Sequence, residues 1–176
     1  MAIPNFFKKL LFSRQFFYEN GKFFLMMKVP GIILPMQAFT SFVHQYLKDG
    51  GEKAIEHVYT VGHEQGKNAG KRYINISNTS FPGFTEFVKG VAEVMGLGKI
   101  TAFSQEGSKI IAVMNPSIFA ETSRELFGKT KKPVCHYIRG IAAGLFEPFL
   151  KYDTVCEETY CKAKGDSMCR FVIKKR

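Results

Sequence analysis

Apolar positions follow helical spacing over several stretches of this chain of 176 residues. Between Met36 and Lys48, apolar residues stand at positions 36, 39, 42, 43, 46 and 47, which predicts a helix that ends at Gly50-Gly51. The same periodicity predicts further helices over residues 5–12, 52–73, 82–95, 115–127 and 133–150. Because each helix presents an apolar face, we expect the helices to pack around a shared core.

Shorter runs separated by turn residues predict three antiparallel hairpins. Asn20-Gly21 separates the first two runs, and this dipeptide favours the type I′ turn of a two-residue hairpin. The predicted strand pairs are 14–19 with 22–29, 99–104 with 109–114, and 159–162 with 168–173. Helices that alternate with antiparallel hairpins indicate an α+β fold, and no linker is long enough to divide it, so we expect one domain over residues 1–176.

Three glycines interrupt the predicted helix over residues 52–73. Gly62, Gly66 and Gly70 recur every four residues and therefore lie on one helical face. Each glycine costs helix stability, yet a face without side chains allows another backbone to approach closely. We therefore expect a second helix to pack tightly against this face.

Two cysteines face each other in the last predicted hairpin. Pairing centred on Gly165 of the turn puts Cys161 directly across from Cys169. Their thiols are then close enough to share a metal ion, to form a disulfide or to pack as small apolar groups. A disulfide is disfavoured because no secretory signal is evident, and the absence of a Cys-x-x-Cys motif leaves a metal site and unrelated buried cysteines equally open.

A third thiol and a carboxylate accompany this pair. Cys135 follows Pro133 at the start of a predicted helix, where free backbone amides favour the thiolate that binds metals. Glu158 lies three residues before Cys161, so it faces the other way in a regular strand, and a bulge or strong twist is needed to turn it round. Cys156 stands apart, and we expect it to be a small buried residue in a strand.

The pattern Glu158-x-x-Cys161-x-Ala163-x-Gly165-Asp166-x-x-Cys169-x-Phe171, with Cys135 before an apolar helix, resembles the vinyl-4-reductase domain family. That family includes the aromatic-sensing input domains of certain bacterial transcription activators. It is also distantly similar in fold to subunits of the transport protein particle that tethers vesicles. A looser similarity extends through Tyr59-x-x-Gly62-x-x-x-Gly66. The resemblance implies the same fold, in which antiparallel hairpins pack with several helices.

The resemblance also implies a zinc site. In the sensor domains a cysteine, a glutamate and two further cysteines at this spacing hold a zinc ion, and they correspond to Cys135, Glu158, Cys161 and Cys169. Three thiolates and a carboxylate complete a tetrahedron, whereas a catalytic zinc keeps one position open for water. We therefore expect a structural zinc ion, held within residues 133–173, that joins the last helix to the last hairpin.

An apolar pocket is the second implied feature, because the sensors hold their effector in a cavity in this part of the fold. The candidate pocket residues lie on elements that must pack together, and each is otherwise an ordinary core residue: Phe84, Phe87, Phe103, Val113, Met114 and Phe119. Phenylalanine and methionine favour an apolar or aromatic ligand. The tryptophan that contacts phenol in the sensors corresponds to Met114, and their histidine falls near Glu86, so this chain lacks both phenol contacts.

Charge and motifs exclude several other functions. With 25 Lys and Arg against 15 Asp and Glu, the formal net charge is +10, but the basic clusters are scattered and no nucleic-acid-binding motif accompanies them. No apolar stretch reaches the roughly 20 residues of a membrane span. The four histidines form no catalytic pair, and no nucleophile or nucleotide motif is present, so we expect no catalytic residue.

These features together predict a cytoplasmic, zinc-stabilised sensory domain that binds a small hydrophobic or aromatic molecule. We expect it to form a homodimer and to pass its signal to a separate partner. One alternative is an enzyme or accessory protein of tetrapyrrole vinyl reduction, the activity that gave the family its name, although no hydride-cofactor site is evident. Another is a structural adaptor, for which a filled core and a large apolar surface patch are typical.

Overall fold

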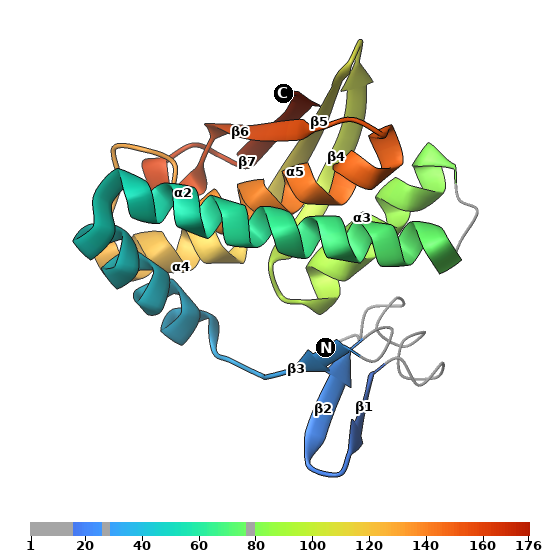
Figure 1. Cartoon of the computed structure of the whole chain (residues 1–176). Coiled ribbons are helices and arrows are strands. Elements are labelled where there is room, and N and C mark those ends of the chain that lie inside the picture. Colours follow the sequence, from blue (N-terminus) through green and yellow to red (C-terminus); the bar gives the residue numbers. More distant parts are fainter. Residues whose placement is uncertain (1–15, 26–28, 77–79) are drawn as a thin grey trace.

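The computed structural model describes residues 16–25, 29–76 and 80–176 (Figure 1). The predicted helix over residues 5–12 lies outside these ranges. In the described part, helices alternate with antiparallel strands, which confirms the predicted α+β fold. None of the described helices combines the length and the apolar character that crossing a membrane requires.

A small antiparallel sheet opens the described chain. Its strands are β1 (Phe16–Glu19), β2 (Lys22–Leu25) and β3 (Val29–Gly31), in the order β1-β2-β3. Asn20 and Gly21 connect β1 to β2 with φ angles of 49° and 73°. These positive values are those of a type I′ turn, so the predicted first hairpin is confirmed.

A second sheet of four antiparallel strands forms one wall of the core. Its strands are β4 (Gly98–Glu106), β5 (Lys109–Ser117), β6 (Thr154–Tyr160) and β7 (Cys169–Lys175), in the order β4-β5-β7-β6. The two predicted hairpins are thus joined edge to edge through β5 and β7. In that pairing Met114 of β5 lies opposite Cys169, the first residue of β7.

Four helices complete the described fold: α2 (Met36–Ile76), α3 (Phe81–Val94), α4 (Ile118–Phe127) and α5 (His136–Leu150). Figure 1 shows α5 lying between the four-stranded sheet and the long helix α2. The two helices predicted over 36–48 and 52–73 form α2, with a break at Gly51, whose φ of 57° and ψ of −137° are not helical.

Glycines allow α2 and α5 to pack backbone against backbone. A Cβ atom on Gly62 would overlap the carbonyl oxygen of Tyr137, and one on Gly66 would overlap that of Ile141. The contact is reciprocal, because a Cβ on Gly140 would overlap the carbonyl oxygen of Tyr59. The predicted tight helix packing is therefore confirmed, and α5 is its partner.

The buried carboxylate of Glu147 forms ion pairs between the same two helices. Glu147 of α5 is 7% exposed, and its carboxylate lies 2.9 Å from Nε2 of His63 and also pairs with Lys67, both on α2. The hydrogen bond to Glu147 raises the pKa of Lys67, which keeps this lysine charged. A buried carboxylate without these partners would be costly, so the three groups depend on one another.

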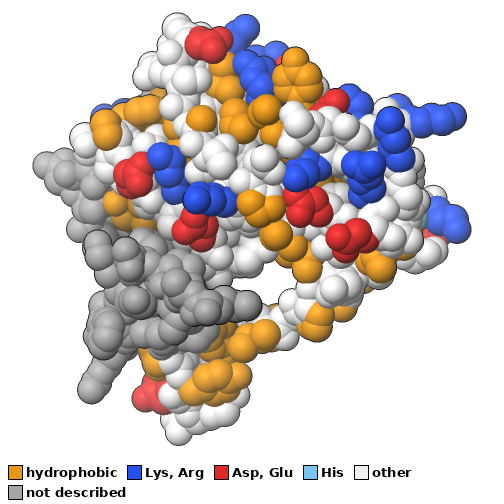
Figure 2. Space-filling view, turned by 180° about the vertical axis from the view of Figure 1, so that it is seen from behind, with side chains coloured by type: hydrophobic (Ala, Val, Ile, Leu, Met, Phe, Trp, Pro, Cys, Tyr) orange, Lys and Arg blue, Asp and Glu red, His pale blue; other side chains and the backbone are white. Residues whose placement is uncertain are grey.

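Basic side chains are distributed over the surface. On the face that Figure 2 shows, Lys and Arg side chains alternate with Asp and Glu rather than forming one continuous patch. Several of them pair locally, as Lys162 does with Glu121 and Lys174 with Glu157. On this face the distribution agrees with the scattered basic clusters of the sequence.

Candidate metal centre and apolar cavity

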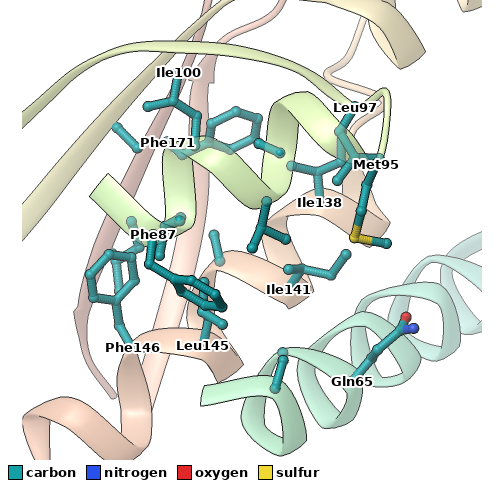
Figure 3. A pocket seen from close by; sticks show the side chains of 18 of the residues that line it. Gln65, Phe87, Met95, Leu97, Ile100, Ile138, Ile141, Leu145, Phe146 and Phe171 are labelled. Atoms are coloured by element: carbon teal, nitrogen blue, oxygen red, sulfur yellow. The ribbon is translucent and has the colours of Figure 1, made fainter. Parts of the chain in front are cut away.

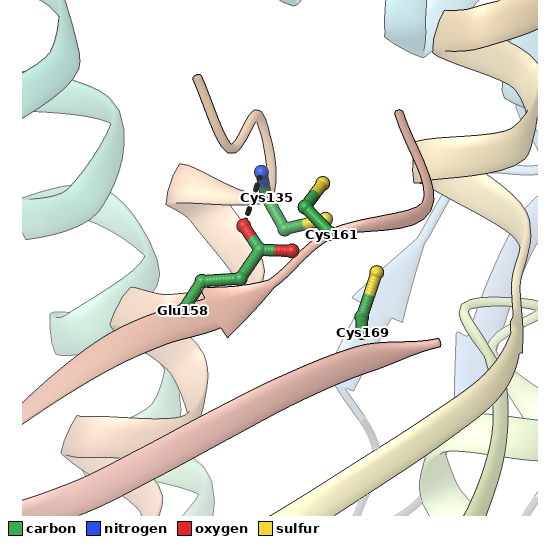
Figure 4. Close-up of side chains that lie close together, drawn as sticks. All are labelled: Cys135, Glu158, Cys161 and Cys169. Carbon is green, nitrogen blue, oxygen red and sulfur yellow. Dashed lines mark hydrogen bonds between the residues drawn. The ribbon is translucent and has the colours of Figure 1, made fainter. Parts of the chain in front are cut away.

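Three parts of the chain bring together Cys135, Glu158, Cys161 and Cys169. Cys135 immediately precedes α5, Glu158 lies in β6, and the other two cysteines flank the short helix η1 (Lys162–Lys164). All four residues are buried, and their candidate ligand atoms lie within 4.8 Å of one another (Figure 4). The cluster could therefore hold a metal ion.

A bulge in β6 turns Glu158 toward the thiols. Glu158 pairs with Phe171, whereas Tyr160 pairs with Arg170, so β6 contains one extra residue between these pairs. This is the irregularity that the sequence required for Glu158 to reach the cysteines. The thiols of Cys161 and Cys169, which the turn at Gly165 predicted to lie close together, are within 4.8 Å of each other.

The turn between β6 and β7 is held by its own side chains. The backbone N–H of Cys161 donates to Oδ2 of Asp166 at 2.7 Å, and β6 ends at Tyr160, two residues before the end of the predicted strand. Gly165 has a φ of 99°, which favours glycine. Ala163 is fully buried, and its carbonyl accepts the N–H of Thr130 at 3.0 Å. Alanine, glycine and aspartate in the motif therefore shape the loop that carries the cysteines.

The two oxygens of Glu158 have different surroundings. Oε2 accepts the backbone N–H of Cys135 at 3.1 Å, whereas Oε1 is buried and has no hydrogen-bond partner among the described residues. Figure 4 shows the carboxylate beside the three cysteine side chains. A buried carboxylate oxygen without a partner is costly, and a cation bound by the thiols would stabilise it. The donor set therefore fits a metal ion.

A cavity of about 350 Å³ lies between α2, α3, α5 and the inner face of the four-stranded sheet (Figure 3). Its volume falls within the range of about 300–1,000 Å³ that is typical of ligand pockets. Most of its lining is aliphatic or aromatic, and α5 contributes Ile138, Ile141, Ala142, Leu145 and Phe146. The cavity could therefore enclose a small apolar molecule with apolar side chains on most sides.

Three of the six candidate pocket residues line this cavity: Phe87, Phe103 and Met114. Phe84 is instead fully buried between α3 and α5, where its ring stacks on Phe149 with centroids 5.0 Å apart. The remaining two, Val113 and Phe119, are also outside the lining.

The local structure explains both positions. Val113 neighbours Met114 in β5 and therefore points to the opposite face of the sheet. Phe119 lies in α4, with its ring 5.8 Å from that of Phe39 in α2. Glu86, near which the sensors' histidine falls, is not among the cavity residues and pairs with Lys89 at 2.6 Å.

The C-terminal part of the chain is similar to a known protein family. Residues 115–175 match the vinyl-4-reductase domain, and this range contains Cys135, Glu158, Cys161 and Cys169. The match confirms the family resemblance of the cysteine and glutamate pattern.

Three solved structures share the fold of this chain. The phenol-responsive sensory domain of the transcription activator PoxR, with phenol, has a TM-score of 0.79 at 17% identity, covering 99% of this chain and 92% of that one. A vinyl-4-reductase family protein from Methanocaldococcus jannaschii has a TM-score of 0.54 at 21% identity, covering 83% and 84%. A trafficking protein particle complex subunit 3 from Naegleria fowleri, covalently bound to palmitic acid, has a TM-score of 0.56 at 19% identity, covering 80% and 95%. These likenesses show the fold.

The pKa values of the three clustered thiols, Cys135, Cys161 and Cys169, are shifted in different directions. Hydrogen bonds with Cys135 and Cys169 lower the pKa of Cys161 to about 2. The hydrogen bond with Cys161, then that with Cys169, and burial raise the pKa of Cys135 well above its ordinary value. For Cys169, the hydrogen bond with Cys135 lowers the pKa, but the bond with Cys161 and burial outweigh it and raise the pKa to about 12. Within the cluster the lowered pKa is therefore that of Cys161, whereas burial and the neighbouring thiols raise that of Cys135.

Metal binding to the cluster of Cys135, Glu158, Cys161 and Cys169 should release protons. Burial raises the pKa of Glu158 to about 8, so at pH 7 this carboxyl group, Cys135 and Cys169 hold their protons while Cys161 is ionised. We expect one zinc ion to displace about three protons at pH 7, and zinc affinity to fall as the pH is lowered. Titration calorimetry in buffers of different ionisation enthalpy measures this number. Release of fewer than two protons would contradict the assignment of these residues as ligands.

Most of the residues that line the cavity were not predicted from the sequence. The sequence-based candidates came from α3, α4, β4 and β5, whereas α2 and α5 supply much of the lining. A signal was present, because Gly66 of the predicted glycine face lines the cavity. The glycine spacing identified the faces along which two helices meet, and the cavity lies beside that contact.

Proposed function

We propose that this chain is a sensory domain that binds a small hydrophobic or aromatic molecule in the apolar cavity and passes the signal to a separate partner. The cavity itself is the observation that carries the proposal. A structural adaptor is expected to have a filled core, whereas here apolar side chains of four elements surround about 350 Å³ of space. The fold shared with a phenol-responsive sensory domain supports the same function.

A structural zinc ion is the second part of the proposal. Thiolate-rich, fully buried sets of four ligands are typical of structural zinc, and Cys135, Glu158, Cys161 and Cys169 are such a set. With four protein ligands the ion has no open position for a substrate. It would hold the start of α5 against the β6-β7 turn. The cysteines form no disulfide, which suits a reducing compartment such as the cytoplasm.

The metal centre and the cavity share two elements. Cys135 precedes α5, which lines the cavity, and Met114 in the cavity wall lies opposite Cys169 in the sheet. Zinc binding would therefore fix two walls of the cavity in place. This arrangement gives a structural ion a direct role in ligand binding without any contact between the ion and the ligand.

A homodimer is also part of the proposal. Between β3 and α2 the chain exposes Ile32 and Ile33 by 82% and 74%, and the first half of α2 exposes Phe42 by 70%. Phe42 stacks on Tyr46, with ring centroids 6.4 Å apart, so the exposed apolar surface continues along the helix. Exposed apolar surface of this kind favours association with a protein partner, and we assign it to a second copy of the chain.

Filling the cavity tests the proposed function. Ala142 lines the cavity from α5 and is half-buried, so Ala142→Phe would place a ring in the space with little disturbance of the core. We expect decanol, an apolar probe, to bind the natural chain and the Ala142→Ser control, and to bind Ala142→Phe at least about tenfold more weakly. Isothermal titration calorimetry measures this. Equal affinity for Ala142→Phe, with unchanged thermal unfolding, would show that the cavity is not the binding site.

A further inference from the structure

The polar side chains of the cavity lie on one wall. Every lining residue from the sheet, α3 and α5 is apolar, and the polar ones are Gln65, Asn68 and Arg72 of α2. Their spacing of three and four residues puts them on one face of that helix. All three are also exposed to solvent, so they mark the rim at which the cavity meets water.

Arg72 gives this rim a positive charge. It is the charged residue of the lining, and no carboxylate lies among the lining residues that the structure describes. Within the described ranges, Arg72 is in no side-chain hydrogen bond or ion pair, unlike Lys67, one turn earlier on α2, which pairs with Glu147. Its guanidinium group is therefore available to a ligand.

The neighbouring amides add hydrogen-bond donors. Oε1 of Gln65 accepts the hydroxyl proton of Tyr137, which leaves the amide N–H groups of Gln65 to donate. Figure 3 shows Gln65 on α2 to one side of the apolar cluster formed by Ile138, Ile141 and Leu145. With Asn68 between Gln65 and Arg72, the rim combines amide donors with a guanidinium group.

We propose that the ligand is an amphiphilic carboxylate, whose apolar part fills the cavity and whose carboxylate binds Arg72 at the rim. The inference rests on the proposed function and names the ligand class of the same site. A guanidinium group matches a carboxylate with two parallel hydrogen bonds, which favours this anion over an alcohol or an amine. The apolar wall excludes a charged group from the interior, so the carboxylate must lie at the rim.

Paired probes that differ only in the head group test the inference. Decanoate and decanol carry the same apolar chain, and calorimetric titration at low salt gives both dissociation constants. Because Arg72 is exposed, we expect a moderate preference, with decanoate bound roughly fivefold more tightly than decanol by the natural chain. Added salt should reduce this preference.

Two variants distinguish the effect of Arg72 on decanoate binding from the effect of the net positive charge of the chain. Arg72→Gln should weaken the binding of decanoate to about the level of decanol, so that the preference is lost. Lys71→Gln removes the same charge from an exposed neighbour that does not line the cavity, and should keep the preference. Thermal unfolding of both variants checks that they are folded.

The possible outcomes distinguish the inference from the proposed function. Equal binding of decanoate and decanol by the natural chain would overturn the carboxylate inference and leave the cavity as an apolar site. A preference that persists in Arg72→Gln would also overturn it. Binding of neither probe would overturn the proposed function itself, whereas a preference lost only in Arg72→Gln supports both.

Discussion

Replacing Cys161 by serine is expected to remove the zinc ion and to lower the melting temperature by at least about 10 °C. Cys161 is fully buried, and hydrogen bonds with Cys135 and Cys169 lower its pKa to about 2. It is therefore the thiol of the cluster that is most readily ionised, and the thiolate is the form that binds zinc. A serine hydroxyl is a poor zinc ligand at neutral pH. The loss would release the β6-β7 turn from the start of α5. Metal analysis together with thermal unfolding measures both effects.

Cys156→Ser is the matched control. Cys156 is also buried, at 4% exposure, but lies in β6 outside the cluster, where its backbone N–H donates to the hydroxyl of Tyr59 at 3.2 Å. We expect this variant to keep one zinc ion per chain and to lose much less stability than Cys161→Ser. Equal zinc contents in the two variants would contradict the proposed structural metal centre. A melting temperature of Cys161→Ser equal to that of the natural chain would also contradict it.

Replacing Gly144 by alanine should destabilise the fold by about 3 kcal/mol or more. A Cβ atom there would overlap the backbone carbonyl oxygen of His63 and would stand 2.7 Å from the backbone nitrogen of Lys67. Neither atom can move without shifting α2. The shift would also disturb the pairs that His63 and Lys67 make with Glu147. Chemical denaturation measures the change in the free energy of unfolding.

Gly107→Ala separates this overlap from the general cost of replacing a glycine. Gly107 lies in the β4-β5 turn with a φ of 59°, and a Cβ atom there meets nothing within 4 Å. The left-handed conformation alone should cost about 1 kcal/mol. Equal losses for Gly107→Ala and Gly144→Ala would contradict close backbone packing between α2 and α5.

The sequence was sufficient to predict the facing cysteines. The position of Gly165 defines the centre of the turn, and the positions of Cys161 and Cys169 follow from strand pairing. The orientation of Glu158 was less predictable, because the regular alternation of a strand points its side chain away from Cys161 and Cys169. The sequence showed that a bulge was needed but not where it would form, since the position of the extra residue depends on the register of the neighbouring strand β7.

The cavity could be predicted only in part. Neighbouring residues in a strand point to opposite faces of the sheet, so Val113 and Met114 cannot both line the cavity. The sequence was therefore sufficient to exclude one of these two candidates. The positions of Phe84 and Phe119 depend on how α3 and α4 rotate against their neighbours, which a single helical pattern does not determine. The contribution of Arg72 was not predictable, because it depends on where the contact between α2 and α5 ends and the space beside it opens.

Native mass spectrometry of the freshly isolated chain tests the central claim most directly, because it reports the metal, the oligomer and any retained small molecule together. We predict a dimer with one zinc ion per chain and a retained apolar molecule that the Ala142→Phe variant does not hold. Chains that carry zinc but no small molecule, and that bind neither decanol nor decanoate when these are added, would contradict the account.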